Sequence, residues 1–222
     1  QLSARLSELL GQAIVIENRA GAGGTIGTAE LAKSPPDGYT IGLIYDSHVV
    51  NPIFYPGAPY DALNDFAFIS QLVAAPLILV AHPGVQAGNL KELVALSRAR
   101  PGTLNYGSPG SGSSNHLVME KLKLATGLDA QHIPYKGGAP IVADIMGGTL
   151  QLAFANPGTV LPHVRSGKMK ALGVSASGRS SAFPGVPTLE ESGAPGFDVR
   201  SWIGIVAPAH TPNDVVGRLN AV

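Results

Sequence analysis

The sequence predicts an α/β fold with largely parallel sheets. Short apolar runs that are typical of buried strands alternate along the chain with longer segments of helical pattern. In two places, around 21–24 and 107–113, a strand leads into a helix through a loop of small residues. With 222 residues, 45% of them hydrophobic and 14% charged, the chain can bury a core either as one large domain or as two small lobes.

The first half of the chain carries clear signals for helix ends. Gly11 follows an amphipathic segment, at the position where glycine commonly ends a helix. Asn89 is followed three residues later by Glu92, which is the capping-box spacing of a helix start. We therefore expect helices over 2–10, over 25–33 and from Asn89 onward, and strands near 13–17, 39–45, 66–73 and 77–81.

The second half repeats the alternation of strand and helix. Thr211-Pro212-Asn213-Asp214 combines an N-cap residue, a proline for the first helical position and a first-turn acid, so it predicts a last helix. The glycine-, proline- and serine-rich segment 175–196 predicts an irregular surface excursion with one short helix around 188–192. The remaining expected elements are strands over 104–106, 131–133, 150–155, 170–174 and 202–206, and helices over 113–126, 139–146 and through 162–165.

Composition excludes several classes of function. Fifteen basic and fifteen acidic side chains cancel, which removes the usual electrostatic footprint of a nucleic-acid-binding protein. The absence of cysteine excludes disulfides, thiol catalysis and cysteine-bound metals. No apolar run reaches the roughly 18 to 20 residues that span a membrane, and Gln1 opens directly on an amphipathic segment without a signal-peptide pattern.

The first small-residue loop, which includes Gly23 and Gly24, is a candidate anion site. A helix N-terminus offers unpaired N–H groups and the positive end of the helix dipole, both of which suit a carboxylate. The alternative is that these glycines only make a tight turn. The spacing is not G-x-G-x-x-G, because Ile26 stands where the third glycine would be, and no P-loop motif occurs. We therefore expect no nucleotide cofactor.

The second small-residue loop contributes the candidate residues Ser108, Gly110, Ser111 and Ser113. Its hydroxyl and N–H groups could both bind a carboxylate, or the loop could be an ordinary turn with a serine as the helix cap. A serine hydrolase is the rival interpretation, because His116 lies close in sequence. The chain has no G-x-S-x-G elbow, so we expect no catalytic residue here.

The remaining candidates follow other predicted strands. Ser47 could donate to a ligand oxygen, while Asp46 could accept from a ligand hydroxyl or ammonium group or remain a solvated turn residue. Asp46 and His48 have the spacing of metal ligands, but no third ligand stands nearby, so we expect no metal site. Tyr135 could form a wall of the site, and Asn156 could combine an N-cap with a ligand contact.

Many short motifs in one order carry a family resemblance that covers nearly all of the chain. The motifs are Glu17-Asn18-Arg19, Gly21-Ala22-Gly23-Gly24, Pro36-Asp37-Gly38-Tyr39-Thr40, Asn51-Pro52, Asp65-Phe66, Tyr106-Gly107-Ser108-Pro109-Gly110, Pro134-Tyr135-Lys136-Gly137-Gly138, Gly167-Lys168, Pro187-Thr188-Leu189-Glu190-Glu191-Ser192-Gly193 and Trp202-Ile203-Gly204-Ile205-Val206-Ala207-Pro208. With them, the chain resembles the tripartite tricarboxylate transporter substrate-binding proteins, often called Bug receptors.

The resemblance implies a two-lobed periplasmic binding protein of the type II fold, with mixed, mostly parallel sheets and a ligand cleft between the lobes. We expect one discontinuous lobe of residues 1–81 and 201–222 and a second lobe of residues 82–200. Compared with the family, the chain is expected to lack a first strand and a ligand-contacting loop before Gln1 and a segment after Val222. Many relatives carry an acidic residue in place of Ala155, which disfavours an amino-acid ligand here.

The function implied by the resemblance is transport in the periplasm. A monomeric receptor would capture a small organic carboxylate and deliver it to integral membrane transporter subunits, without any reaction, cofactor or nucleic-acid partner. Two alternatives remain open at this point: the ligand-sensing module of a regulator, and an α/β hydrolase or transferase.

Overall fold

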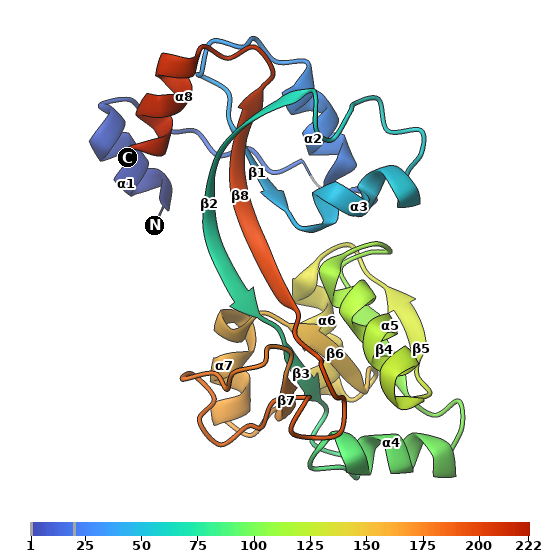
Figure 1. Cartoon of the computed structure of the whole chain (residues 1–222). Helices are drawn as coiled ribbons and strands as arrows, with labels where there is room; N and C mark the ends of the chain where they lie inside the picture. The colour runs from blue at the N-terminus through green and yellow to red at the C-terminus, as the bar shows by residue number, and fades with distance from the viewer. Residues whose placement is uncertain (1, 20) are drawn as a thin grey trace. The chain divides into compact units, whose positions relative to one another are not determined.

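The computed structural model describes residues 2–19 and 21–222 (Figure 1). Its internal contacts divide the chain into two units, Gln1–Val73 with Trp202–Val222, and Ala74–Ser201. Two long strands, β2 (Phe66–Pro76) and β8 (Arg200–Pro208), each begin in one unit and end in the other. They carry the chain across both unit boundaries.

The first unit contains a three-stranded sheet in the order β1-β8-β2. Strand β1 (Gly42–Tyr45) is antiparallel to β8, with Gly42 opposite Val206. The core is small, because only a few side chains, such as Ile44, Phe66 and Val206, are buried together. The helices of this unit are α1 (Leu2–Leu10), the 3₁₀ turn η1 (Ala22–Gly24), α2 (Thr25–Ala32), α3 (Ser47–Phe54) and α8 (Asn213–Asn220).

The second unit contains a five-stranded sheet in the order β5-β4-β6-β3-β7. Strand β4 is parallel to β5 and β6, whereas β3 is antiparallel to β6 and β7, so four strands run in one direction and β3 opposes them. The mixed α/β fold expected from the sequence is confirmed. The strands are β3 (Ile78–Ala81), β4 (Asn105–Ser108), β5 (Gln131–Pro134), β6 (Leu152–Ala155) and β7 (Lys170–Val174).

Helices cover both faces of this sheet (Figure 1). Leu79 faces a cluster that includes residues of α4 (Leu90–Ala99) and α5 (Ser114–Thr126). Ile78 and Val80 face the opposite cluster, which includes residues of α6 (Gly138–Gly147) and α7 (Pro157–Arg165). Successive residues of β3 thus point to opposite faces, and all four are fully buried, as in a central strand.

This position of β3 differs from the expectation that 77–81 ends the first lobe. Ile78 pairs with Ala155 and with Val174, so the strand belongs to the sheet of the second unit. The apolar run alone could not reveal this, because a buried strand has the same composition in either unit.

In the first unit one predicted strand is wrong and one helix was not predicted. Residues 13–17 form no strand, and Val15 and Ile16 are 83% and 64% exposed. β-branched residues stabilise a strand mainly by packing on neighbouring apolar side chains. These residues have no such surface to cover, so the run stays irregular. Helix α3, which carries Pro52 inside it, was not predicted. Proline removes a backbone donor and is rare in helix interiors, so its presence disfavoured a helix at this position.

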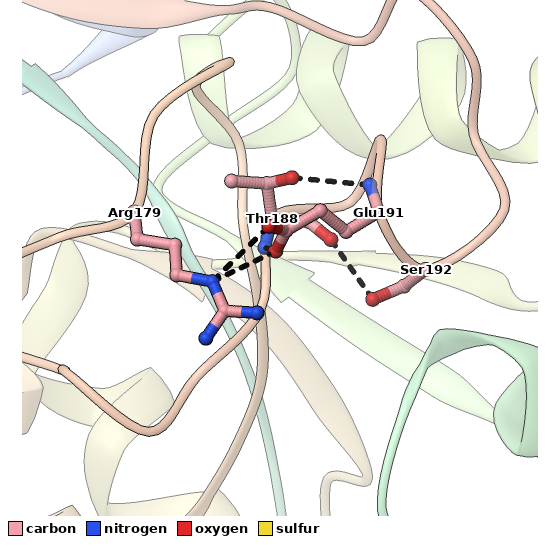
Figure 2. A network of polar contacts seen from close by, with 4 residues as sticks. All are labelled: Arg179, Thr188, Glu191 and Ser192. Carbon is pink, nitrogen blue, oxygen red and sulfur yellow. Dashed lines mark hydrogen bonds and ion pairs between the residues drawn. The ribbon is translucent and has the colours of Figure 1, made fainter.

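Predicted helix starts near 188 and 211 are also corrected. Residues 188–193 form a hydrogen-bonded turn instead of a helix. Thr188 Oγ1 accepts from the Glu191 amide and the Glu191 carboxylate accepts from the Thr188 amide, while Arg179 pairs with the same carboxylate (Figure 2). The last helix starts at Asn213 with Pro212 as its N-cap and no side-chain capping bond, and the Thr211 hydroxyl donates to the Pro208 carbonyl.

Candidate functional site

Three candidate segments of the second unit lie at one edge of its sheet. Ser108 ends β4, Tyr135 follows β5, and Asn156 follows β6. The Tyr135 amide donates to the Ser108 carbonyl at 2.9 Å, which joins the first two segments directly. Because β4, β5 and β6 are parallel, their carboxyl ends meet at the edge where ligands bind in open α/β sheets.

The loop between β4 and α5 is shaped by glycines and by its own serines. Gly110 has φ +145° and Gly112 has φ +79°, conformations that side chains disfavour. Ser113 is the N-cap of α5: its hydroxyl oxygen accepts from the His116 amide and its hydroxyl donates to the Gly110 carbonyl at 2.7 Å. Loop conformation and helix start are thus fixed by the same residue.

Ser108 supports the loop from below. Its side chain is fully buried, and its hydroxyl oxygen lies 2.9 Å from the Gly110 carbonyl and 2.7 Å from Nε2 of His132. The amides of Gly110, Gly112 and Ser113 also donate within the unit. The hydroxyls of Ser108 and Ser113 therefore hold the loop, whereas the side chain of Ser111 is exposed.

A stack of rings beneath this loop was not found by sequence reasoning. The centroids of His116 and His132 are 4.0 Å apart, and His132 stacks on Tyr106 at 4.9 Å. The Tyr106 hydroxyl donates to Glu120 at 2.5 Å, and Lys123 pairs with the same carboxylate at 2.7 Å. The cluster depends on the register of β4 and β5, which places Tyr106 opposite His132. This register could not be predicted from the sequence.

Burial governs the electrostatics of the stack. Burial and then the charge of His116 lower the pKa of His132 to about 4, and burial also lowers the pKa of His116. Burial and the bond to Glu120 raise the pKa of Tyr106. Burial alone would raise the pKa of Glu120, but hydrogen bonds from Lys123 and Tyr106 outweigh it and lower that pKa. At neutral pH the stack holds neutral imidazoles beside one ion pair.

Tyr135 and Asn156 occupy different environments at the sheet edge. The Tyr135 hydroxyl donates to Asp144 at 2.6 Å, and this bond raises the pKa of Tyr135 to about 12. The ring is half-buried beside Gly107, so it can act as a wall. Asn156 is exposed and is the N-cap of α7, but its side chain makes no capping bond. Its amide group can therefore face a ligand.

In the first unit, Gly23 and Gly24 precede α2, with φ angles of +64° and +95°. The Asn51 amide group donates to the Gly23 carbonyl at 3.3 Å, and a Cβ on Gly23 would lie 2.9 Å from the ring of Tyr55. Helix α3 thus holds this glycine loop. Asn51 is a residue that sequence reasoning missed as a support, although it stood in a motif of the resemblance.

Asp46 and Ser47 begin α3. The Asp46 carboxylate accepts from the Ser47 amide at 3.0 Å, so it caps the helix. His48 points elsewhere: its Nε2 lies 2.7 Å from the Ala62 carbonyl and its ring packs against Phe66. Among residues 2–19 and 21–222, no three His, Asp or Glu side chains gather to hold a metal ion.

The first unit also contains a hollow of about 790 Å³ that sequence reasoning did not predict. It is open, and it lies between α2 and the segment that follows α3. Gly23 and Gly24 do not line it. Its lining residues are Thr25, Ile26, Ala29, Glu30, Lys33, Phe54, Tyr55, Pro56, Gly57, Ala58 and Pro59.

Comparison with known families covers the whole chain. The model described as the tripartite tricarboxylate transporter family receptor matches residues 1–222. The chain belongs to this receptor family. Protein BugT of Bordetella pertussis is 40% identical over 221 residues, which are 99% of this chain and 68% of that protein. The chain thus spans about two thirds of the length of the curated relatives that it matches.

Solved structures of similar receptors confirm the fold. A Rhodopseudomonas palustris protein, Rpa4515 with adipate, superposes with a TM-score of 0.95 at 34% identity, over 99% of this chain and 74% of that one. MatC of the same organism with bound malate gives 0.92 at 31% identity, over 99% and 75%. The periplasmic binding protein BugD gives 0.92 at 34% identity, over 98% and 73%. The periplasmic binding protein fold expected from the resemblance is confirmed.

The family defines a class of substrate-binding receptors of tripartite transporters and not a class of enzymes. Its members include periplasmic binding proteins. Within the described part of this receptor, no helix has the length and apolar character needed to cross a bilayer.

Proposed function

We propose that this receptor captures a small organic carboxylate in the periplasm and delivers it to the integral membrane subunits of a tripartite transporter. It acts as a monomer and turns nothing over. The observation that carries the proposal is the Ser108–Ser113 loop, a small-residue loop at the start of a long helix and at the carboxyl edge of a sheet. Similar receptors hold adipate and malate, which supports a carboxylate as the ligand class.

The candidate residues take different roles in this proposal. Gly110 and Ser111 lie on the accessible part of the loop, where the dipole of α5 favours an anion. Ser108 and Ser113 act indirectly, by holding that loop. Tyr135 forms a wall, and Asn156 donates from its side-chain amide. Gly23, Gly24, Asp46 and Ser47 are the contributions that we propose from the first unit.

One contact favours a second candidate function, a serine hydrolase. Ser108 Oγ lies 2.7 Å from His132 Nε2, a separation typical of a nucleophile and its base. Ser108 is fully buried, however, and its hydroxyl also faces the Gly110 carbonyl, so a substrate would have to displace the loop. The receptor function fits this burial better. A sensing module of a regulator would share the same ligand chemistry.

Calorimetry with adipate and malate tests the proposal, with product analysis of the same samples. We expect saturable binding of a dicarboxylate, no conversion of it, and a rise in melting temperature. Ligand at 100 times its Kd adds about 2.7 kcal/mol to stability. Neutral diamides of the same acids serve as the control and should not bind. Failure of a broad set of carboxylates to bind would overturn the proposal, and conversion of a bound ligand would favour the hydrolase.

A further inference from the structure

Two histidines of the ring stack contact the candidate loop from below. Gly112 donates its amide proton to Nδ1 of His116 at 3.2 Å, while Nε2 of His132 lies 2.7 Å from Ser108 Oγ. Both rings are partly buried and lie face to face at 4.0 Å. The loop is thus attached to the histidine pair at its beginning and near its end.

The contact with Gly112 defines the protonation state of His116. A backbone N–H can only donate, so Nδ1 of His116 must carry a lone pair and no proton. A proton on Nδ1 would place two donors against each other. The loop in its observed form therefore requires a neutral His116 with its proton on Nε2.

The surroundings oppose a positive charge on His116. The ring lies in the first turn of α5, at the positive end of the helix dipole, and it stacks on His132. Lys123 of the same helix adds a cation, but Glu120, which pairs with Lys123 and Tyr106, attracts a proton on His116 at least as strongly as Lys123 repels it. Burial is therefore the main obstacle to a proton on His116, and at His132 repulsion from His116 adds to burial.

We propose that His116 is a positioning residue whose neutral ring holds the loop of residues 108–113 in its binding form, and that protonation of the stacked pair releases the loop and weakens carboxylate capture. This inference rests on the proposed function. It predicts that the receptor binds a carboxylate with high affinity at neutral pH and with lower affinity in acid.

The pKa directions agree with the geometry. Burial lowers the pKa of both histidines, so the pair is neutral at pH 7 and gains protons only in acid, with His132 at about 4. The loop is therefore expected to be intact above pH 6.5, the ordinary histidine value, and to be released as the pH falls from there toward 4.

The first experiment needs no ligand. Nuclear magnetic resonance of the protein from pH 7.5 to 4.5 follows the His116 ring nitrogens and the Gly112 amide. We expect both signals to shift together with one midpoint, below 6.5. In His116→Asn, whose side-chain oxygen can replace Nδ1 as the acceptor, the Gly112 signal should no longer change with pH. A Gly112 signal that is insensitive to ring protonation would overturn the inference.

The second experiment measures adipate affinity by calorimetry over the same pH range. From pH 7.5 to 4.5 the wild type should lose about tenfold more affinity than His116→Asn, the effect of a one-unit difference in pKa between free and bound states. The Asn variant also corrects for protonation of adipate itself. His116→Phe, which has no acceptor, should bind weakly at every pH.

A matched control comes from His82, whose Nδ1 accepts from the Gly84 amide at 3.0 Å outside the loop. His82→Asn should keep the pH dependence of the wild type. Parallel loss of affinity in the wild type and His116→Asn, or a gain of affinity in acid, would overturn the link between protonation and binding. Absence of adipate binding at pH 7.5 would count against the proposed function, and the ligand-free measurement would still decide whether protonation releases the loop.

Discussion

At the scale of single residues, the chemistry of the candidate loop of residues 108–113 could be predicted only in part. The small residues and the helix start were visible in the sequence, and Ser113 is indeed the cap of α5. The inward direction of Ser108 was not visible, because it depends on His132, which lies far along the chain and reaches the loop only through strand pairing. Side-chain direction in a loop is a tertiary property.

Ser113→Ala should destabilise the protein by about 1 kcal/mol, because the cap of α5 and the bond to Gly110 are both lost. Urea unfolding at pH 7.5 measures this change. Ser111→Ala, on an exposed side chain of the same loop, is the matched control and should cost less. Equal costs for both variants would contradict the role of Ser113 as the cap.

Gly110→Ala should destabilise the protein by roughly 1 to 3 kcal/mol through backbone strain, since φ is +145° and no atom blocks the new methyl group. Gly147→Ala tests the cause, because that site is also open but its φ does not favour glycine. We expect the control to be neutral or stabilising by up to about 1 kcal/mol. Similar unfolding midpoints for the two variants would show that strain at Gly110 is absent.

At the scale of elements, prediction worked where one pattern had one explanation. The strand expected over 170–174 is β7 with the same bounds, and the helix expected over 113–126 is α5. The strand predicted over 13–17 was wrong, because that run is exposed, and the proline-containing α3 was not predicted. The order of the strands in each sheet could not be predicted, because the composition of a strand does not show which strands are its neighbours.

Leu79→Ala in the central strand β3 should cost about 2 to 5 kcal/mol, because the fully buried side chain leaves a cavity between the sheet and its helices. Leu124→Ala on α5 is the control, since that side chain is 88% exposed and should change stability by less than about 0.5 kcal/mol. Denaturant unfolding compares the two. A small effect at Leu79 would contradict the central position of β3.

At the scale of the whole molecule, the two units have cores of unequal size. The second unit buries two large clusters, one on each face of its sheet, whereas the buried clusters of the first unit are small. Amide hydrogen exchange should therefore be slower in β3, β6 and β7 than in β1 and α2, because local opening is easier where few apolar contacts must break. Equal protection in both units, measured by mass spectrometry, would contradict this.

Stability should fall in acid. Burial lowers the pKa of His48, His116 and His132, so the unfolded chain binds more protons than the folded one below pH 6.5. The free energy of unfolding is therefore at its plateau above 6.5 and decreases as the pH falls toward 4. Urea unfolding at pH 7.5 and 5.0 measures this. His48→Gln should reduce the slope, and a flat profile would contradict burial of these rings.

The antiparallel insertion of β3 also has a consequence for how the chain is made. The pairing partners of β3 come much later in the chain, since Ile78 pairs with Ala155 on one side and with Val174 on the other. During synthesis on the ribosome, β3 therefore emerges well before the strands that it pairs with. Until then, an unpaired strand of four apolar residues is exposed, with both of its edges open to wrong partners. Such distant pairing raises the contact order and slows folding. The strand pairs of β3 with β6 and β7 therefore form late in folding. A nascent chain that stops before β6 is expected to aggregate.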